Sequence, residues 1–366
     1  LKRISRYENI QMAKKISLNS AYGAIGNSYF RYFDLMVATA ITSSGQLSIR
    51  WIEKAINIYL NKILKTDEVD YVIASDTDSV YITFDVLVDK VFKSGRTDEE
   101  VVNFLDRLAK EKLEPFIGES YQALAKSMNA YEQKMFMARE AIADKGIWTA
   151  KKRYILNVHD MEGVRFKEPH LKIMGIEAVK SSTPAPCREK IKEALKIIMS
   201  GDEKMLNSFI RDFREEFMKL PPEDIAYPRS CNGVKKYTAT SQSTIDLMSG
   251  ESVQYGFFKK GAPIHVKGAI LMNHLVEKNN LSHKYPYIQE GDKIKFIALK
   301  EPNVYQSSAF SFMTSFPTEF GLEELIDRSQ QFEKSFVEPL RFITDKISWT
   351  IDGSYGSQGT LEDFFG

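Results

Sequence analysis

Two short hydrophobic strand patterns meet at the turn Asp76-Thr77-Asp78-Ser79, and this feature constrains the fold most strongly. Residues 72–74 are apolar, and residues 80–84 alternate between apolar and polar side chains, so the pattern predicts an antiparallel hairpin at 70–85. Two carboxylates a few Å apart are costly to ionise together unless a cation lies beside them. Mg²⁺ prefers oxygen ligands and leaves places open for substrate phosphates. The turn therefore indicates a catalytic metal site for phosphoryl transfer, with an ordinary solvated turn as the alternative.

A second pattern lies near the N-terminus, where Lys15, Asn19 and Tyr22 fall on one face of a predicted helix. A cation, an amide and a phenol in one row suit a nucleoside triphosphate. Lys15 can meet phosphate oxygens as a mobile point charge, and Tyr22 offers a flat surface near the base or sugar. Gly23 leaves room for a base pair to approach the backbone. The alternative is an amphipathic helix with a solvated polar face.

The remaining helical patterns are clear from periodicity and caps. An apolar stripe predicts a long helix at 36–64, after a first helix at 4–24. Thr97 and Glu100 form a predicted capping box, and Pro115 should bend or restart the helix that follows. Further helices are expected on both sides of Ser200-Gly201-Asp202, over 187–219, and again at 320–345; residues 225–300 are mixed and rich in strand formers.

Strand patterns follow between the helical regions. They occupy residues 135–142, 147–158, 164–166 and 171–177, with a turn expected at Asp144-Lys145-Gly146. We expect these strands to join the hairpin in one antiparallel sheet with helices on one face, which is an α+β fold.

Composition bounds the class of protein. The 366 residues include 43% hydrophobic and 27% charged residues, which is ordinary for a globular chain. No run of about 18 apolar residues and no signal-peptide pattern occurs, so we expect an intracellular protein whose two cysteines, Cys187 and Cys231, are free thiols.

The net charge of +1 is unevenly spread. Residues 1–35 carry six Lys and Arg against two acidic residues, and 145–180 carry eight against four, whereas 318–366 carry four against ten. Basic early segments and an acidic C-terminal segment indicate local phosphate binding. The alternative is that these charged side chains are simply solvated.

Three ordered motifs resemble those of family B DNA polymerases. Lys15-x-x-x-Asn19-Ser20-x-Tyr22-Gly23 resembles the fingers-helix motif, Asp76-Thr77-Asp78-Ser79 the palm motif, and Lys151-Lys152-Arg153-Tyr154 the motif that holds the primer–template duplex. The sequence around these motifs is similar to the replicative polymerases of T4-like bacteriophages. The similar segments include Ser181-Ser182-Thr183-Pro184 and the final Leu361-Glu362-Asp363-Phe364-Phe365-Gly366.

The resemblance implies a domain order. Residues 1–35 would form the C-terminal fingers helix and its connection, 36–182 the palm, and 183–352 a mixed α/β thumb. Residues 353–366 would form a flexible tail with a clamp-binding peptide, since a Gly- and Ser-rich linker precedes three large apolar residues. The implied setting is the replisome in the cytoplasm of an infected bacterium.

The resemblance also assigns roles to residues. Asp78 and Asp76 would be catalytic and would hold two Mg²⁺ ions, with Mn²⁺ as the alternative ion and Glu140 as a further ligand candidate. Asp78 would be the shared ligand of both ions. The implied nucleotide-binding residues are Lys15, Asn19, Tyr22 and Gly23; the DNA-binding residues are Thr77, Lys151, Lys152 and Tyr154; and the clamp-binding residues are Leu361, Phe364 and Phe365.

Two motifs of the family are missing from this sequence. It contains neither the Asp-x-x-Ser-Leu-Tyr-Pro palm motif nor a Phe-Asp-x-Glu exonuclease segment. We therefore expect the C-terminal catalytic part of a DNA-directed DNA polymerase that needs an N-terminal polypeptide for the second catalytic aspartate, and that is inactive as this chain alone. A split product, a processed product and a truncated chain remain open. The alternative function is a non-catalytic DNA- or clamp-binding subunit that retains the polymerase fold.

Overall fold

The computed structural model describes residues 2–92, 95–176, 179–238, 258–259 and 261–352. The chain divides into two compact units, which are described separately below. The first holds residues 1–143 and 158–168, and the second holds 144–157 and 169–366. No helix within the described ranges is long and apolar enough to cross a membrane.

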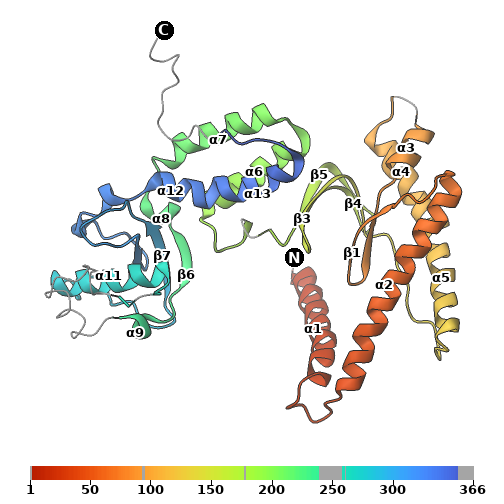
Figure 1. Ribbon diagram of the computed structural model, residues 1–366, viewed down its shortest axis with the longest axis horizontal. Helices are drawn as coiled ribbons and strands as arrows, with labels where there is room; N and C mark the ends of the chain where they lie inside the picture. The colour runs from red at the N-terminus through yellow and green to blue at the C-terminus, as the bar shows by residue number, and fades with distance from the viewer. Residues whose placement is uncertain (1, 93–94, 177–178, 239–257, 260, 353–366) are drawn as a thin grey trace, which may run out of the picture. The chain divides into compact units, whose positions relative to one another are not determined.

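The first unit begins with two helices, α1 (Lys2–Ile25) and α2 (Leu35–Leu64), at the positions that the sequence predicts (Figure 1). Asp34 caps α2 by accepting a hydrogen bond from the Val37 N–H at 3.0 Å. The buried side chains of α2 recur every fourth residue at Ile52, Ile56 and Leu60, and they pack in the core of this unit. By contrast, α1 buries no residue, so its polar row is open to solvent.

A second group of helices follows: α3 (Asp85–Val91), α4 (Asp98–Leu108), the π-helical turn η1 (Ala109–Leu113) and α5 (Glu114–Ser127). The capping box of Thr97 and Glu100 is present. Pro115 lies in the first turn of α5 and cannot donate to the carbonyl four residues earlier, so the wider π turn immediately before it is where the helix adjusts.

The strands form two separate sheets in this part of the chain, and the prediction of one common sheet is wrong for the described residues. β1 (Val72–Asp76) pairs with β2 (Ser79–Ile82), whereas β3 (Ala141–Ala150), β4 (Arg153–Met161) and β5 (Val164–Met174) form a sheet in the order β3-β4-β5. Residues 135–140, expected to begin a strand, have no regular structure. There the Arg139 N–H donates to Glu114 Oε1 at 2.9 Å instead of joining a strand ladder.

Two further strand predictions are corrected. No turn occurs at Asp144-Lys145-Gly146, because β3 continues through it. A Cβ on Gly146 would meet the Trp148 ring at 2.6 Å and the Leu156 side chain at 2.8 Å, so the strand needs a glycine at this position although the residue is exposed. The reversal instead lies at Lys151-Lys152. β5 is one strand where two were predicted, and it tolerates Pro169 because it is an edge strand.

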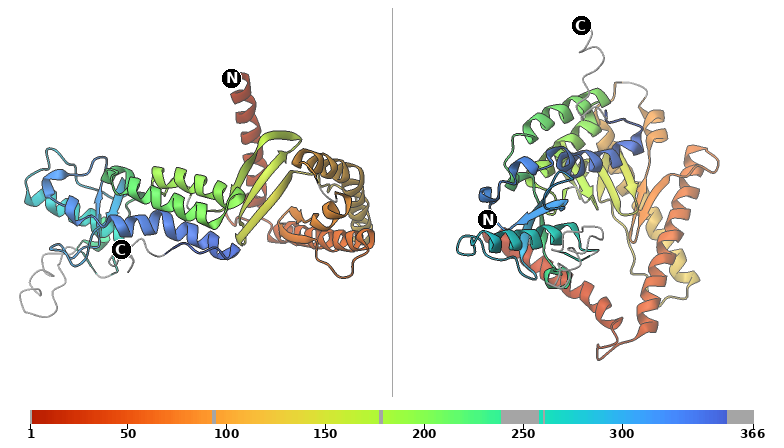
Figure 2. Two further views of the ribbon diagram at one scale, coloured as in Figure 1. Left: turned by 90° about the horizontal axis from the view of Figure 1, so that it is seen from above. Right: turned by 60° about the vertical axis from the view of Figure 1, so that its left-hand side comes forward.

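The second unit continues with helices and a three-stranded antiparallel sheet. Its sheet has the order β6-β7-β8, and α11 packs closely on β8. Figures 1 and 2 show α6, α7 and α13 side by side. The elements are α6 (Ala185–Ser200), α7 (Glu203–Phe217), α8 (Pro222–Ile225), β6 (Tyr227–Ser230), α9 (Val234–Tyr237), α11 (Ile264–Lys278), β7 (Lys293–Ala298), β8 (Ala309–Phe312), η4 (Thr318–Phe320), η5 (Glu323–Leu325), α12 (Arg328–Phe332), η6 (Glu333–Val337), α13 (Glu338–Thr344) and η7 (Asp345–Ile347).

An aromatic cluster joins the helices of this unit. The Phe213 ring lies 4.7 Å from that of Phe336, and the Phe217 ring lies 5.2 Å from that of Phe332. The break at Ser200–Asp202 is confirmed, and Asp202 caps α7. Cys187 and Cys231 are free thiols in the core, as predicted.

Candidate active site

The predicted hairpin is present, with the two aspartates at its turn. Asp76 ends β1 and pairs with Ser79, so Thr77 and Asp78 form a two-residue loop. The Asp78 N–H donates to the Asp76 carbonyl at 2.6 Å, and the Ser79 hydroxyl donates to the same carbonyl at 3.2 Å. Asp76 is half-buried and Asp78 is exposed. The two aspartates therefore flank Thr77 in a tight loop, and the Asp78 side is open to solvent.

Thr77 adopts an unusual backbone conformation between the two aspartates. Its φ is +57°, which lies in the left-handed region that β-branched residues seldom enter. Its hydroxyl donates to Asp76 Oδ1 at 2.9 Å, and this bond helps to hold the conformation. Such a conformation costs about 1–3 kcal/mol and persists only where the surroundings fix it, which is common at functional sites.

Helix α2 holds the start of the hairpin through hydrogen bonds, an arrangement that the sequence analysis missed. Asn57 Oδ1 accepts hydrogen bonds from the N–H groups of Tyr71 and Val72 at 2.8 and 3.2 Å, and Asn57 Nδ2 donates to Asp70 at 2.7 Å. The fully buried Tyr71 places its hydroxyl 2.8 Å from that of Thr66. The signal available in the sequence was Asn57 itself, a polar residue that lies beside the buried stripe of α2 and four residues before Asn61.

The donor set at the turn suits a hard divalent cation, but it is incomplete. Two carboxylates can hold Mg²⁺ while other positions remain for phosphate oxygens, water and further protein ligands. Within the described ranges, no three or more His, Cys, Asp or Glu side chains are grouped closely enough to hold a metal. Asp76, Asp78 and Glu140 are thus not gathered into one such cluster.

Glu140 lies immediately before β3, with its side chain exposed. Its carbonyl accepts a hydrogen bond from the Glu162 N–H at 2.7 Å, which ties it to the β4–β5 turn. Its assignment as a metal ligand stays a prediction.

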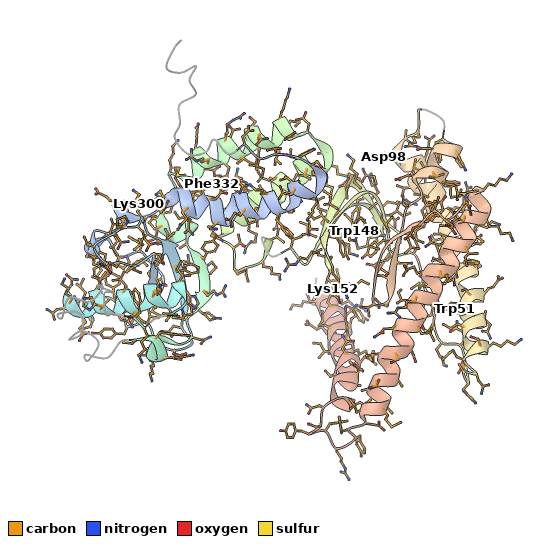
Figure 3. The ribbon with its side chains drawn as sticks, in the orientation of Figure 1. Trp51, Asp98, Trp148, Lys152, Lys300 and Phe332 are labelled. Atoms are coloured by element: carbon orange, nitrogen blue, oxygen red, sulfur yellow. The ribbon has the colours of Figure 1, made fainter. Side chains whose placement is uncertain are left out.

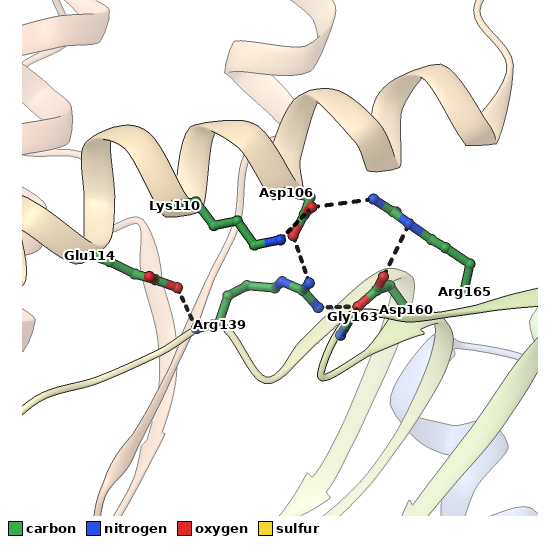
Figure 4. Close-up of polar contacts among 7 residues, drawn as sticks. All are labelled: Asp106, Lys110, Glu114, Arg139, Asp160, Gly163 and Arg165. Carbon is green, nitrogen blue, oxygen red and sulfur yellow. Dashed lines mark hydrogen bonds and ion pairs between the residues drawn. The ribbon is translucent and has the colours of Figure 1, made fainter.

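Beside Glu140 lies a partly buried network of ion pairs that the sequence analysis did not find (Figure 4). Arg139 forms an ion pair with Asp160, whose side chain is only 1% exposed, and a second one with Asp106 at 2.6 Å. Arg165 contacts the same two carboxylates, at 3.1 Å from Asp160 and 3.6 Å from Asp106, and Lys110 lies 3.0 Å from Asp106. Burial raises the pKa of Asp106, but the hydrogen bonds from Lys110 and Arg139 outweigh it, so its pKa lies below its ordinary value.

The predicted nucleotide-binding row is helical and exposed. Lys15, Asn19 and Tyr22 all lie on α1, and Tyr22 is 45% exposed. A Cβ on Gly23 would meet nothing within 4 Å, so its flank of the helix is open for a ligand. The structure thus provides the accessible row that the sequence predicts, and its role stays a prediction.

The predicted DNA-binding residues of the second unit occupy the β3–β4 turn and the strand after it. Lys151 and Lys152 are exposed at this turn, which Figure 3 shows at one end of the sheet. Tyr154 is buried, and its ring stacks on that of Trp148 with the centroids 6.1 Å apart. The lysines are therefore accessible to a phosphate backbone, whereas Tyr154 packs within its own unit. Thr77 of the first unit is exposed.

The predicted clamp-binding residues Leu361, Phe364 and Phe365 lie outside the described residues.

Comparisons with known proteins agree with the motifs. A family model described as DNA polymerase family B matches residues 2–114. The chain is 36% identical over 97% of its length to the DNA-directed DNA polymerase of Enterobacteria phage T4, and 36% identical over 97% to that of Escherichia phage RB69. It is 24% identical over 79% of its length to DNA polymerase 1 of Aeropyrum pernix, of which it covers 24%. The chain spans 38% of the length of each phage relative.

Proposed function

Because the chain belongs to DNA polymerase family B, close to the enzymes of T4-like phages, we propose that it supplies part of the catalytic centre of a DNA-directed DNA polymerase. The reaction is the transfer of a nucleotide from a deoxynucleoside triphosphate to the 3′ end of a primer. The observation that carries the proposal is the hairpin turn that presents Asp76 and Asp78 on either side of Thr77.

In this proposal Asp78 and Asp76 hold the divalent cations. Asp78, whose side chain is exposed, would be the shared ligand, and the half-buried Asp76 would assist from the end of β1. When bound, two Mg²⁺ ions, or Mn²⁺ in their place, would activate the primer 3′-oxygen and stabilise the departing pyrophosphate. Asn57 keeps the start of β1 fixed on α2, and the Thr77 hydroxyl orients the Asp76 carboxylate. Glu140 is a further candidate for the acidic set.

The exposed row on α1 would bind the incoming nucleotide. Lys15 would neutralise phosphate charge, Asn19 would offer amide hydrogen bonds, and Tyr22 with Gly23 would present a flat, open surface to the nascent base pair. Because charged hydrogen bonds contribute about 1.5–3 kcal/mol, one lysine is enough to matter measurably.

The exposed lysines of the β3–β4 turn would contact the phosphates of the primer–template duplex, with Thr77 near the primer end. The burial of Tyr154 against Trp148 supports a role in shaping the strand that follows the two lysines. Its direct contact with the primer, which the family resemblance implies, stays a prediction.

The remaining catalytic parts would come from outside these 366 residues. The sequence has no Asp-x-x-Ser-Leu-Tyr-Pro segment, so the second catalytic aspartate, and any exonuclease, would be supplied by an N-terminal polymerase polypeptide. A two-metal site that lacks one carboxylate supplier should not turn over. The other proposed partners are primer–template DNA, deoxynucleoside triphosphates and a sliding clamp, in the cytoplasm of the infected host.

Complementation tests this proposal. The purified chain should extend no primer, and addition of the N-terminal polypeptide of a T4-like polymerase with Mg²⁺ should start synthesis. In the completed enzyme, Asp78→Asn should abolish extension and leave duplex binding largely intact, because a lost ligand removes several kcal/mol of transition-state stabilisation, or roughly a thousandfold in rate. Asp89→Asn, another exposed carboxylate of the same unit, is the matched control.

If the Asp78→Asn enzyme extended primers at the wild-type rate, Asp78 would not be an essential metal ligand. Failure of any N-terminal polypeptide to restore synthesis, with duplex binding retained, would favour the non-catalytic subunit.

A further inference from the structure

Gly175, directly after β5, makes an unusually close approach to the β3–β4 turn. A Cβ at this position would meet the backbone carbonyl oxygen of Lys152 well inside 3.0 Å, and Arg153 Cγ at 3.1 Å. The approach follows from the topology. β4 and β5 are joined by the tight turn Glu162-Gly163, so β5 runs back along β4 and ends beside its first residues.

The obstacle to a side chain at residue 175 is backbone, not a flexible side chain. Gly175 has φ +67°, and Lys152 itself has φ +63° in the left-handed region. A methyl group at 175 would therefore force the Lys152 carbonyl, or the end of β5, to move by about 1 Å to reach van der Waals contact. Since Lys152 is the second residue of a two-residue loop, that movement would reorient the whole loop.

Conformational freedom alone does not account for this glycine. Gly163, in the β4–β5 turn of the same sheet, has a similar φ of +86°, but a Cβ there would meet nothing within 4 Å. The two glycines thus separate backbone strain, which both share, from steric conflict with the lysine turn, which belongs only to Gly175.

We propose that Gly175 is a positioning residue for DNA binding, because its missing side chain sets the orientation of the Lys151–Lys152 turn toward duplex phosphates. The inference rests on the proposed function of these lysines as phosphate contacts. A phosphate contact depends on where the ammonium group stands, and a displacement of about 1 Å at the base of the turn is enough to weaken it.

The first test measures duplex binding by the 366-residue chain, using fluorescence anisotropy with a labelled primer–template across a salt series. Lys152→Ala and Gly175→Ala should each weaken binding about five- to tenfold, and each should reduce the salt slope by about 0.9, the loss of one phosphate contact. The double variant should lose less affinity than the two single losses combined, because both changes remove the Lys152 contact. Gly163→Ala should bind like the wild type.

The second test measures the turn itself by amide hydrogen exchange, with no DNA present. Exchange at residues 151–154 should accelerate in Gly175→Ala and stay at the wild-type rate in Gly163→Ala. Unchanged exchange in Gly175→Ala would overturn the proposal. So would wild-type binding by Gly175→Ala alongside weakened binding by Lys152→Ala.

The two tests also distinguish this proposal from the function on which it rests. If Lys152→Ala and the wild type behave identically toward DNA, the phosphate role of the turn fails, and hydrogen exchange alone decides whether Gly175 positions it. If Gly175→Ala does not fold, adding Lys152→Gly should restore folding, because glycine at 152 lets the carbonyl move away. A double variant that stays unfolded would contradict the close approach as the cause.

Discussion

The environment of single residues decides their chemistry in both units. Burial raises the pKa of the Cys187 thiol to about 11, although a hydrogen bond with Ser335 opposes the rise, and burial raises that of Cys231 to about 11, with Glu290 and Asp292 adding to it. Both thiols are therefore protonated core groups. At the hairpin, by contrast, Asp78 is exposed to solvent.

The thiol pKa values predict how stability depends on pH. A folded-state pKa of about 11 for Cys187 lies above the ordinary value of 9.0, so its stabilising contribution is complete below pH 9 and is lost as the pH rises toward 11. The loss should reach up to about 2 kcal/mol in the free energy of unfolding. Urea unfolding of the wild type and of Cys187→Ala between pH 8 and 11 measures it.

The comparison with Cys187→Ala cancels the other groups that titrate in this range. The stability difference between the two proteins should shrink as the pH rises. A difference that is the same at pH 8 and pH 10.5 would show that the thiol does not ionise on unfolding as expected.

Lys15 and its neighbour Lys14 offer a matched pair on α1. Both are exposed, but only Lys15 lies on the face with Asn19 and Tyr22. In the completed polymerase, Lys15→Ala should raise the KM for nucleotide or lower the incorporation rate roughly ten- to a hundredfold, since one charged hydrogen bond contributes about 1.5–3 kcal/mol. Single-nucleotide incorporation kinetics measure the effect, and Lys14→Ala should stay near the wild type. An unchanged nucleotide dependence in Lys15→Ala would favour a solvated helix face.

At the level of elements, the network of Arg139 joins three segments of the first unit. Asp106 and Glu114 approach Arg139 from one helical run, although eight residues separate them. In a regular α-helix eight residues would turn about 80° beyond two full turns. The π turn η1 lies between them and has fewer degrees of rotation per residue, so it brings both carboxylates toward Arg139. The irregular segment before β3 is thereby fastened to helix α4 and to the β4–β5 turn.

Breaking this network should cost far more than breaking a surface pair. Arg139→Met would leave Asp160, with its side chain 1% exposed, without one of its charge partners. We expect a loss of about 3–5 kcal/mol in the free energy of unfolding, measured by denaturant titration. The control is Arg96→Met, because the Arg96–Asp89 pair has side chains 42% and 69% exposed and should change stability by about 1 kcal/mol or less. Equal losses in the two variants would show that burial does not distinguish them.

At the level of the whole molecule, the C-terminal tail is predicted to act separately from the catalytic residues. Leu361, Phe364 and Phe365 have the spacing of a short helical turn after a Gly- and Ser-rich linker. Tethering through such a peptide raises processivity by effective concentration and leaves the chemical step unchanged.

Deletion of residues 360–366 should therefore abolish clamp-stimulated synthesis on long templates and spare single-nucleotide incorporation. Primer extension with and without the clamp, using the completed polymerase, measures both. Equal clamp stimulation of the shortened and intact enzymes would exclude the tail as the contact.

Features set by neighbouring residues could be predicted from the sequence. The two first helices, the hairpin that carries Asp76 and Asp78, the capping box at Thr97 and the break at Ser200–Asp202 all depend on local periodicity, caps and turn residues. The motifs that identify the family are also local, because each is a short run of side chains with one shared task.

Features that depend on distant residues were decided only by the tertiary structure. The sequence suggests a turn at Asp144–Gly146, but β3 continues through it, and the glycine leaves room for the Trp148 ring and the Leu156 side chain. Arg139 leaves a predicted strand because Asp106, Glu114 and Asp160, far away in sequence, hold it. The conflict of any side chain at residue 175 with the Lys152 carbonyl arises only once β5 has returned along β4. Local patterns encode which elements form, whereas their pairing and closest contacts depend on which chain segments meet, and that is fixed by packing across the whole unit.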